Sequence, residues 1–199
     1  DCLTLNVVAP DGGSDRPLPV MFFIHGGAYF LGSSATPIYD GASLARSGCV
    51  YVSTNYRLGA LGAVDLSSLS TADIHIDDNL YLRDLVSALR WVRENIAAFG
   101  GDPDNVTIFG ESAGAHAVTT LLAVPAAKGL FAQAISQSPA GALSRSQELA
   151  AEFAAKFASI LCADEREPAR LLLAARPAQL VNAFDRLLTT SASDLAGGY

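Results

Sequence analysis

The sequence predicts an α/β fold, in which a mostly parallel sheet carries helices on its faces. One observation is a set of short apolar runs, typical of strands buried on both faces, at residues 20–24, 49–54, 106–109 and 131–136. A second observation is a long amphipathic segment: apolar residues repeat at helical spacing from about 79 to 99, and Gly100-Gly101 ends the repeat. Strands that alternate with helices are typical of parallel sheets.

Shorter signals complete the first part of the chain. Residues 3–8 alternate as an edge strand does, and residues 10–13 follow as a turn. Residues 63–78 are polar and serine-rich, so we expect them to loop over the surface. Residues 102–105 lack the ligand spacing of a calcium loop and predict a turn instead.

The last part of the chain is alanine-rich and predicts helices. Ser144 with Gln147 fits a capping box, and Pro168 and Pro177 fit the first turns of two further helices. We therefore expect two parts: residues 1–143 with the sheet, and the helical residues 144–199.

Composition narrows the class of protein. Half of the 199 residues are hydrophobic and 17% are charged, as in a globular protein with a buried interior. A net charge of −7 without basic clusters argues against a nucleic-acid partner. No apolar stretch is long enough to span a bilayer, and the three cysteines form no metal-binding motif. Cytoplasmic and secreted locations are both compatible with this sequence.

A G-x-S-x-G pentapeptide at residues 110–114 marks the strongest candidate site. It follows the apolar run 106–109 and opens a helical stretch, which is the context of a serine on a sharp strand-to-helix turn. Gly110 and Gly114 leave room for the helix to cross the strand. Ser112 is therefore a candidate nucleophile, and the amide of Ala113 is a candidate oxyanion donor.

A glycine-rich loop precedes this turn in the chain. The apolar run 20–24 leads directly into His25-Gly26-Gly27-Ala28. Backbone amides of such a loop can supply a further oxyanion donor, although structural glycine turns are equally common.

These motifs occur in an order that resembles the type-B carboxylesterase family, which includes para-nitrobenzyl esterases, cholinesterases and lipases. The resemblance covers residues 1–140, and residues 144–199 match only loosely. The matching segments are DCLTLNV at 1–7, HGGAYFLG at 25–32, NYRLGALG at 55–62, FGGDPDNVTIFGESAG at 99–114 and AKGLFAQAISQS at 127–138.

The resemblance implies an α/β-hydrolase fold and hydrolysis of small-molecule carboxylic esters through an acyl-enzyme. Ser112 would be the nucleophile, and the amides of Gly27, Ala28 and Ala113 would form the oxyanion hole. Ala28 stands where many members have a third glycine. The family needs no cofactor or metal for this chemistry, and residues 144–199 would belong to the cap around the active site.

Two further residues match family positions near the site. Glu111 resembles a glutamate that we expect to form an ion pair beneath the turn, without a proton-transfer role. Ser138 matches a serine near the catalytic histidine, but Pro139 replaces the usual glycine after it. A structural hydroxyl bonded to nearby backbone is the alternative for Ser138. In relatives, cysteines near Cys2 and Cys162 pair with partners outside this segment, whereas Cys49 reads as a small buried residue.

The catalytic base and acid are the missing elements. In this topology they follow the serine in the chain, but the three histidines are His25, His75 and His116. His116 lies one helical turn after Ser112, and we expect it to point back toward the sheet or a neighbouring helix. The acidic residues after the turn are expected to be solvated. We therefore expect that this chain is part of a longer polypeptide, which supplies the missing acid and histidine, and that alone it is nearly inactive.

We expect Arg57 to form an ion pair within the scaffold, and a surface arginine is the alternative.

At the level of function, an ester hydrolase is favoured because Ser112 and the glycine loop are both present. A non-catalytic binding or adhesion member of the same family is the alternative.

Overall fold

The computed structural model describes residues 2–141, 144–161 and 167–196. They form two compact units, one of residues 1–57 with 81–143 and one of residues 58–80 with 144–199. The segment 58–80 thus belongs to the same unit as the C-terminal helices. The predicted division into two domains, residues 1–143 and 144–199, stays a prediction.

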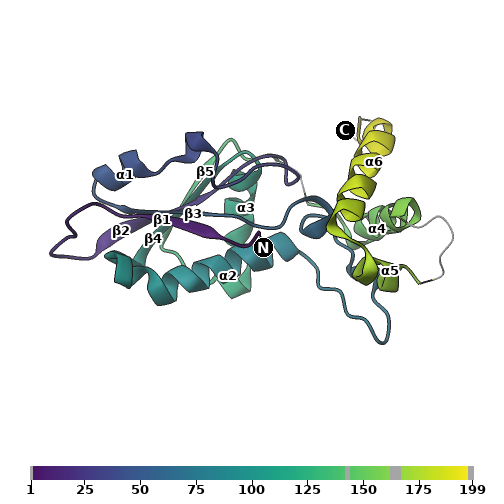
Figure 1. The fold of residues 1–199 in the computed structure, drawn as a ribbon, viewed down its shortest axis with the longest axis horizontal. Coiled ribbons are helices and arrows are strands. Elements are labelled where there is room, and N and C mark those ends of the chain that lie inside the picture. Colours follow the sequence, from purple (N-terminus) through teal and green to yellow (C-terminus); the bar gives the residue numbers. More distant parts are fainter. Residues whose placement is uncertain (1, 142–143, 162–166, 197–199) are drawn as a thin grey trace. The chain divides into compact units, whose positions relative to one another are not determined.

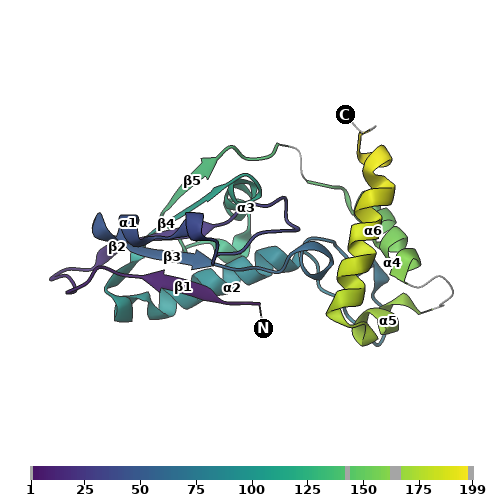
Figure 2. The same ribbon diagram turned by 45° about the horizontal axis from the view of Figure 1, so that its top comes forward.

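The first unit contains a five-stranded sheet in the order β1-β3-β2-β4-β5, with β1 and β5 at its two edges (Figure 2). All neighbouring pairs are parallel except β1 with β3, which are antiparallel. The predicted strands are confirmed, with shifts of one or two residues at their ends except in β4. Strand β5 differs from the prediction of a strand buried on both faces, because all five of its residues are exposed. The strands are β1 Leu5–Val8, β2 Leu18–Ile24, β3 Val50–Thr54, β4 Gly101–Glu111 and β5 Gln133–Gln137.

Strand β4 begins five residues earlier than the apolar run predicts. Leu18 pairs with Gly101 and Val20 pairs with Val106, so residues 102–105 lie outside the ladder. Within this bulge the Asp104 amide donates to the Asp102 carboxylate at 2.9 Å. The turn predicted for these residues is therefore embedded in a strand.

Helices pack on both faces of the sheet, with α1 (Ala42–Arg46) and α2 (Leu80–Asn95) on opposite sides (Figure 1). The long predicted helix corresponds to α2 continued by a 3-10 turn at Ile96–Phe99, and it ends where Gly100 adopts φ 80°. Helix α3 (Ala113–Leu121) follows β4, and two more 3-10 turns occupy Pro37–Tyr39 and Pro125–Ala127. Fully buried apolar side chains of the sheet and helices form the core, among them Phe22, Ile24, Leu85, Leu89 and Ile108.

The parallel strands all end at one edge of the sheet. In register, Ile24 of β2 lies beside Thr54 of β3 and Gly110 of β4, and Glu111 of β4 lies beside Gln137 of β5. Segments that leave these carboxyl ends therefore meet at the same edge, where open α/β sheets bind their ligands.

The second unit is helical and has its own small core. Its helices are α4 (Gln147–Leu161), α5 (Pro168–Ala174) and α6 (Pro177–Ala196), with 3-10 turns at Gly59–Leu61 and Ser67–Leu69. Pro168 and Pro177 open their helices as predicted. Leu66, in the segment expected to loop over the surface, packs against the buried residues Ala60, Phe157, Ala183 and Leu187.

The predicted capping box at the start of α4 is wrong. Ser146, not Ser144, accepts a hydrogen bond from the Leu149 amide at 3.3 Å, which is the side-chain bond of an N-cap residue. The helix thus begins two residues later than the Ser144–Gln147 pair predicts.

The cysteines differ in environment. Cys49 is buried, its thiol donates to the Leu44 carbonyl at 3.0 Å, and burial raises its pKa. This confirms the prediction of a small buried residue. Cys2 is exposed, and Cys162 lies outside the described residues. None of the helices in the described part of the chain combines the length and the apolar character needed to cross a membrane.

Candidate functional site

Ser112 lies on a sharp turn between β4 and α3. Its backbone has φ 55° and ψ −121°, a left-handed conformation that a residue with a side chain rarely adopts. Its amide donates to the Gln137 carbonyl at 3.0 Å, which ties the turn to the end of β5. The side chain is half-buried, so the strained turn expected from G-x-S-x-G is present and Ser112 is not sealed in the interior.

The two glycines of the pentapeptide occupy positions that have no space for a side chain. A Cβ on Gly110 would lie 2.6 Å from the backbone of Gly114 and 2.7 Å from the Ile24 carbonyl oxygen. A Cβ on Gly114 would lie 2.1 Å from that same oxygen. The first turn of α3 therefore packs directly on the end of β2, as the sequence predicts.

The glycine loop after β2 lies against this turn. A Cβ on Gly26 would lie 2.8 Å from the Glu111 carbonyl oxygen and 3.3 Å from the Cβ of Ser112. Gly27 adopts φ 113°, and its carbonyl accepts the amides of Phe30 and Leu31 at 3.1 Å each. These contacts place the loop beside the candidate nucleophile.

Three backbone amides of the glycine loop and of the start of α3 are the candidate oxyanion donors. Among the described residues, the amides of Gly27 and Ala28 donate to no backbone carbonyl. Ala113 is the first residue of α3, where a helix has no internal acceptor for its amide and where the helix dipole favours negative charge. Amides of this kind can stabilise an oxyanion.

Glu111 and Ser138 are both exposed at the carboxyl ends of β4 and β5. Within the described part of the chain Glu111 has no ion-pair partner, so the ion pair expected beneath the turn is not formed there. Ser138 adopts φ 53°, a strained conformation just before Pro139. Glu111 and Ser138 remain candidates for a supporting role at the site, because both lie at the carboxyl end of the sheet.

Two of the three histidines, His25 and His75, differ in their surroundings. His25 is 1% exposed, its Nδ1 is 2.7 Å from the Gly26 carbonyl oxygen, and its Nε2 is buried without a hydrogen-bond partner among the described residues. Burial lowers its pKa. His75 belongs to the other unit, where its exposed ring lies 3.4 Å from Asp77.

The prediction for His116 is wrong in direction. Its half-buried ring does not point back at the sheet; its Nδ1 lies 2.6 Å from the hydroxyl oxygen of Tyr29, in the glycine loop. Helical spacing identifies the face of α3 that carries His116 but not the partner across from it. Sequence reasoning therefore missed Tyr29, whose position four residues after His25 was its only signal.

Acidic residues after the turn are exposed where the structure describes their side chains, as predicted, at Glu148, Glu152, Glu167 and Asp185. Asp164 and Glu165 lie outside the described residues. Among the described residues no group of three or more His, Cys, Asp or Glu side chains could hold a metal ion.

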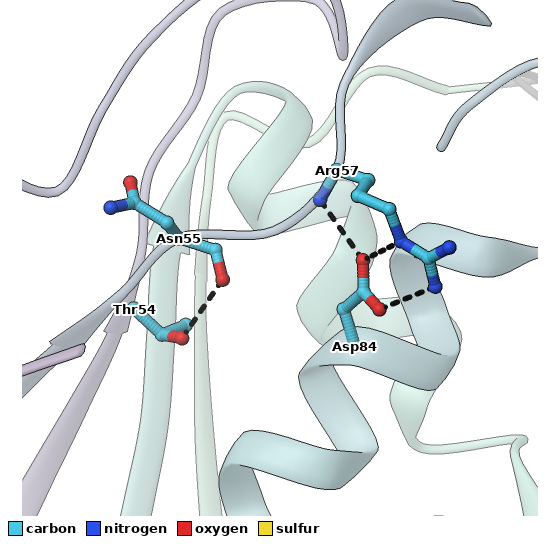
Figure 3. A network of polar contacts seen from close by, with 4 residues as sticks. All are labelled: Thr54, Asn55, Arg57 and Asp84. Carbon is cyan, nitrogen blue, oxygen red and sulfur yellow. Dashed lines mark hydrogen bonds and ion pairs between the residues drawn. The ribbon is translucent and has the colours of Figure 1, made fainter. Parts of the chain in front are cut away.

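Arg57 forms the scaffold ion pair that the sequence predicts, and its partner is Asp84 of α2 (Figure 3). The Asp84 carboxylate accepts from the Arg57 backbone amide at 3.0 Å, from Nε at 2.8 Å and from Nη2 at 2.6 Å. Asp84 is 7% exposed. This bidentate pair fixes the segment that leaves β3 against α2.

Comparison with known proteins places this geometry in a family. The Carboxylesterase family model matches residues 1–197. Para-nitrobenzyl esterase of Bacillus subtilis (strain 168) is 50% identical over 196 residues, which is 98% of this chain and 36% of that protein. Fumonisin B1 esterase of Sphingopyxis macrogoltabida is 43% identical over 173 residues, or 84% of this chain and 32% of that protein.

Solved structures agree. A thermophilic PNB esterase structure superimposes with a TM-score of 0.88 at 48% identity and covers 96% of this chain and 39% of that one. This chain thus spans about a third of the length of the curated relatives it matches. It belongs to the carboxylesterase family and has the α/β-hydrolase fold, as the order of its motifs predicted.

Proposed function

We propose that the protein carrying this chain hydrolyses small-molecule carboxylic esters through an acyl-enzyme on Ser112. The observation that carries the proposal is the strained turn at Ser112, which holds a half-buried serine beside the glycine loop at the carboxyl end of the sheet. Esterases named among the relatives support the reaction class.

In the proposed mechanism, Ser112 Oγ attacks the ester carbonyl carbon and loses its proton to a base. The carbonyl π electrons move onto oxygen, and the amides of Gly27, Ala28 and Ala113 donate to the resulting oxyanion. Collapse of this intermediate breaks the bond to the alcohol, which takes the proton from the base. Water then hydrolyses the acyl-enzyme by the same steps. Each amide donor contributes roughly 10²–10³ in rate.

The base and its acid partner would come from other residues of a longer polypeptide. Two observations support this part of the proposal: His25 is buried against the Gly26 carbonyl, and His116 is bound to Tyr29. On this proposal, the 199 residues alone would turn over a p-nitrophenyl ester very slowly, because removal of one triad member leaves only a small residual rate.

Labelling with a fluorophosphonate tests the proposal. We expect the complete polypeptide to react once and peptide mapping to find the adduct on Ser112. Ser112→Ala should abolish the adduct, while Ser138→Ala should keep it. A complete polypeptide that never reacts would instead favour the non-catalytic binding or adhesion member of the family.

Ala28 provides a prediction about substrate size. Ala28 lies in the proposed oxyanion loop, and its backbone adopts φ 52°. A glycine at this position would lack the methyl group and leave more space. We expect Ala28→Gly to raise kcat/KM for a tertiary-alcohol ester by about tenfold, the size of a methyl-scale steric effect, and to change the value for an acetate of a primary alcohol less than about twofold. Equal rates of both proteins on the tertiary ester would contradict this role for Ala28.

A further inference from the structure

The loop that carries the proposed oxyanion donors is strained. Ala28 and Tyr29 are consecutive residues with side chains at φ 52° and 65°. Such a left-handed conformation costs roughly 1–2 kcal/mol per residue, so contacts elsewhere must hold it. The loop's own hydrogen bonds, from Phe30 and Leu31 to the Gly27 carbonyl, close the turn but do not attach it to α3.

Tyr29 attaches the loop to the helix that begins at Ser112. Its hydroxyl oxygen is 2.6 Å from Nδ1 of His116, and the two rings are nearly perpendicular, with centroids 5.8 Å apart. His116 in turn donates its backbone amide to the Ser112 carbonyl at 2.9 Å. One side-chain hydrogen bond thus spans from the loop of Gly27 and Ala28 to the first turn of α3.

Protonation states suit this bond. Burial raises the pKa of Tyr29 far above its ordinary value, so the phenol keeps its proton. Burial lowers the pKa of His116, so the imidazole is neutral at physiological pH. Two neutral groups therefore share this hydrogen bond: in one tautomer of His116 the Tyr29 O–H donates to Nδ1, and in the other Nδ1–H donates to the phenol oxygen.

Aromatic rings hold Tyr29 on its other sides. Its ring lies 4.8 Å from that of Tyr81 on α2 and 6.5 Å from that of Tyr56, which follows β3. Tyr56 also donates its hydroxyl to the His25 carbonyl at 2.7 Å and stacks on the His25 ring at 4.5 Å. With these rings in place, the Tyr29 hydroxyl is aimed at His116.

We propose that the Tyr29–His116 hydrogen bond sets the spacing between the two halves of the oxyanion hole. One half is the loop amides of Gly27 and Ala28, and the other is the amide of Ala113. Tyr29 and His116 are then positioning residues, and this role rests on the proposed function of Ser112. A displacement of about 1 Å in such a site can cost 10²-fold in rate, so loss of the bond has a measurable kinetic effect.

Three variants of the complete polypeptide test the role of the bond. Tyr29→Phe removes only the hydroxyl. His116→Leu removes the imidazole, and His116→Asn keeps a polar atom on Cγ, where Nδ1 is attached. With p-nitrophenyl butyrate we expect Tyr29→Phe and His116→Leu to lower kcat about tenfold with little change in KM, because the bond acts on the transition state. His116→Asn should retain most of the wild-type kcat.

A double variant and a matched control complete the test. Tyr29→Phe combined with His116→Leu should be no slower than either single variant, because both remove the same bond. Tyr51→Phe removes a hydroxyl that donates to the Tyr39 carbonyl at 2.8 Å, a bond that involves neither the loop nor α3. It should leave kcat and KM unchanged.

The possible outcomes distinguish a failure of this inference from a failure of the proposed function on which it rests. A wild-type protein labelled on Ser112, with Tyr29→Phe at the wild-type kcat, overturns the positioning role and leaves the esterase proposal standing. Multiplied effects in the double variant, or an equal loss in Tyr51→Phe, also overturn it. A wild-type protein that no fluorophosphonate labels overturns both.

Discussion

Gly114→Ala is expected to lower the free energy of unfolding by about 3 kcal/mol and to slow fluorophosphonate labelling of Ser112 by at least about 100-fold. The added Cβ would lie 2.1 Å from the Ile24 carbonyl oxygen and 2.9 Å from that of His25. Both oxygens belong to backbone, so either the end of β2 or the start of α3 has to move. Urea titration and labelling kinetics on the same preparation measure the two effects.

The sign of this effect is informative because helix propensity opposes it. Alanine normally stabilises a helix by roughly 1 kcal/mol relative to glycine. Gly141→Ala is the matched control, since its Cβ would meet nothing within 4 Å, and we expect a change within about 0.5 kcal/mol. A Gly114→Ala protein as stable and as reactive as wild type would show that α3 does not approach β2 this closely.

Local patterns were sufficient to predict most of the sheet and the turn at Ser112. Strands buried on both faces are continuous apolar runs, and Gly110 and Gly114 flank the serine because backbone from three segments meets there. Helix α1 was missed because its five residues are too few to show a period. The start of β4 was misplaced because the four residues 102–105, three polar residues and a proline, bulge out of its ladder.

Local patterns could not predict which residues distant in sequence contact each other. The sequence indicates that Arg57 needs a carboxylate, but many acidic residues could supply it, and only the packing of α2 beside the end of β3 selects Asp84. The same holds for Tyr29 and His116, which are 87 residues apart. Periodicity reports which face of an element is buried, and not what lies across from it.

Asp84→Ala is expected to lower the free energy of unfolding by about 3 kcal/mol, measured by urea titration. The substitution removes the acceptor of three N–H groups of Arg57 from a site where the Asp84 side chain is 5% exposed and that of Arg57 is 31% exposed. Because the Asp84 side chain is buried, solvent replaces its carboxylate only in part.

Asp104→Ala tests whether burial, and not the length of the ion pair, causes the loss of stability expected for Asp84→Ala. Arg93 and Asp104 form an ion pair of 2.5 Å, nearly the same length as the 2.6 Å of Arg57 with Asp84, but their side chains are 43% and 77% exposed. An exposed pair contributes roughly 0–1 kcal/mol, so we expect Asp104→Ala to cost less than about 1 kcal/mol and its small effect to vanish in about 1 M salt. Equal losses for Asp84→Ala and Asp104→Ala would mean that burial does not set the strength of the pair at Arg57.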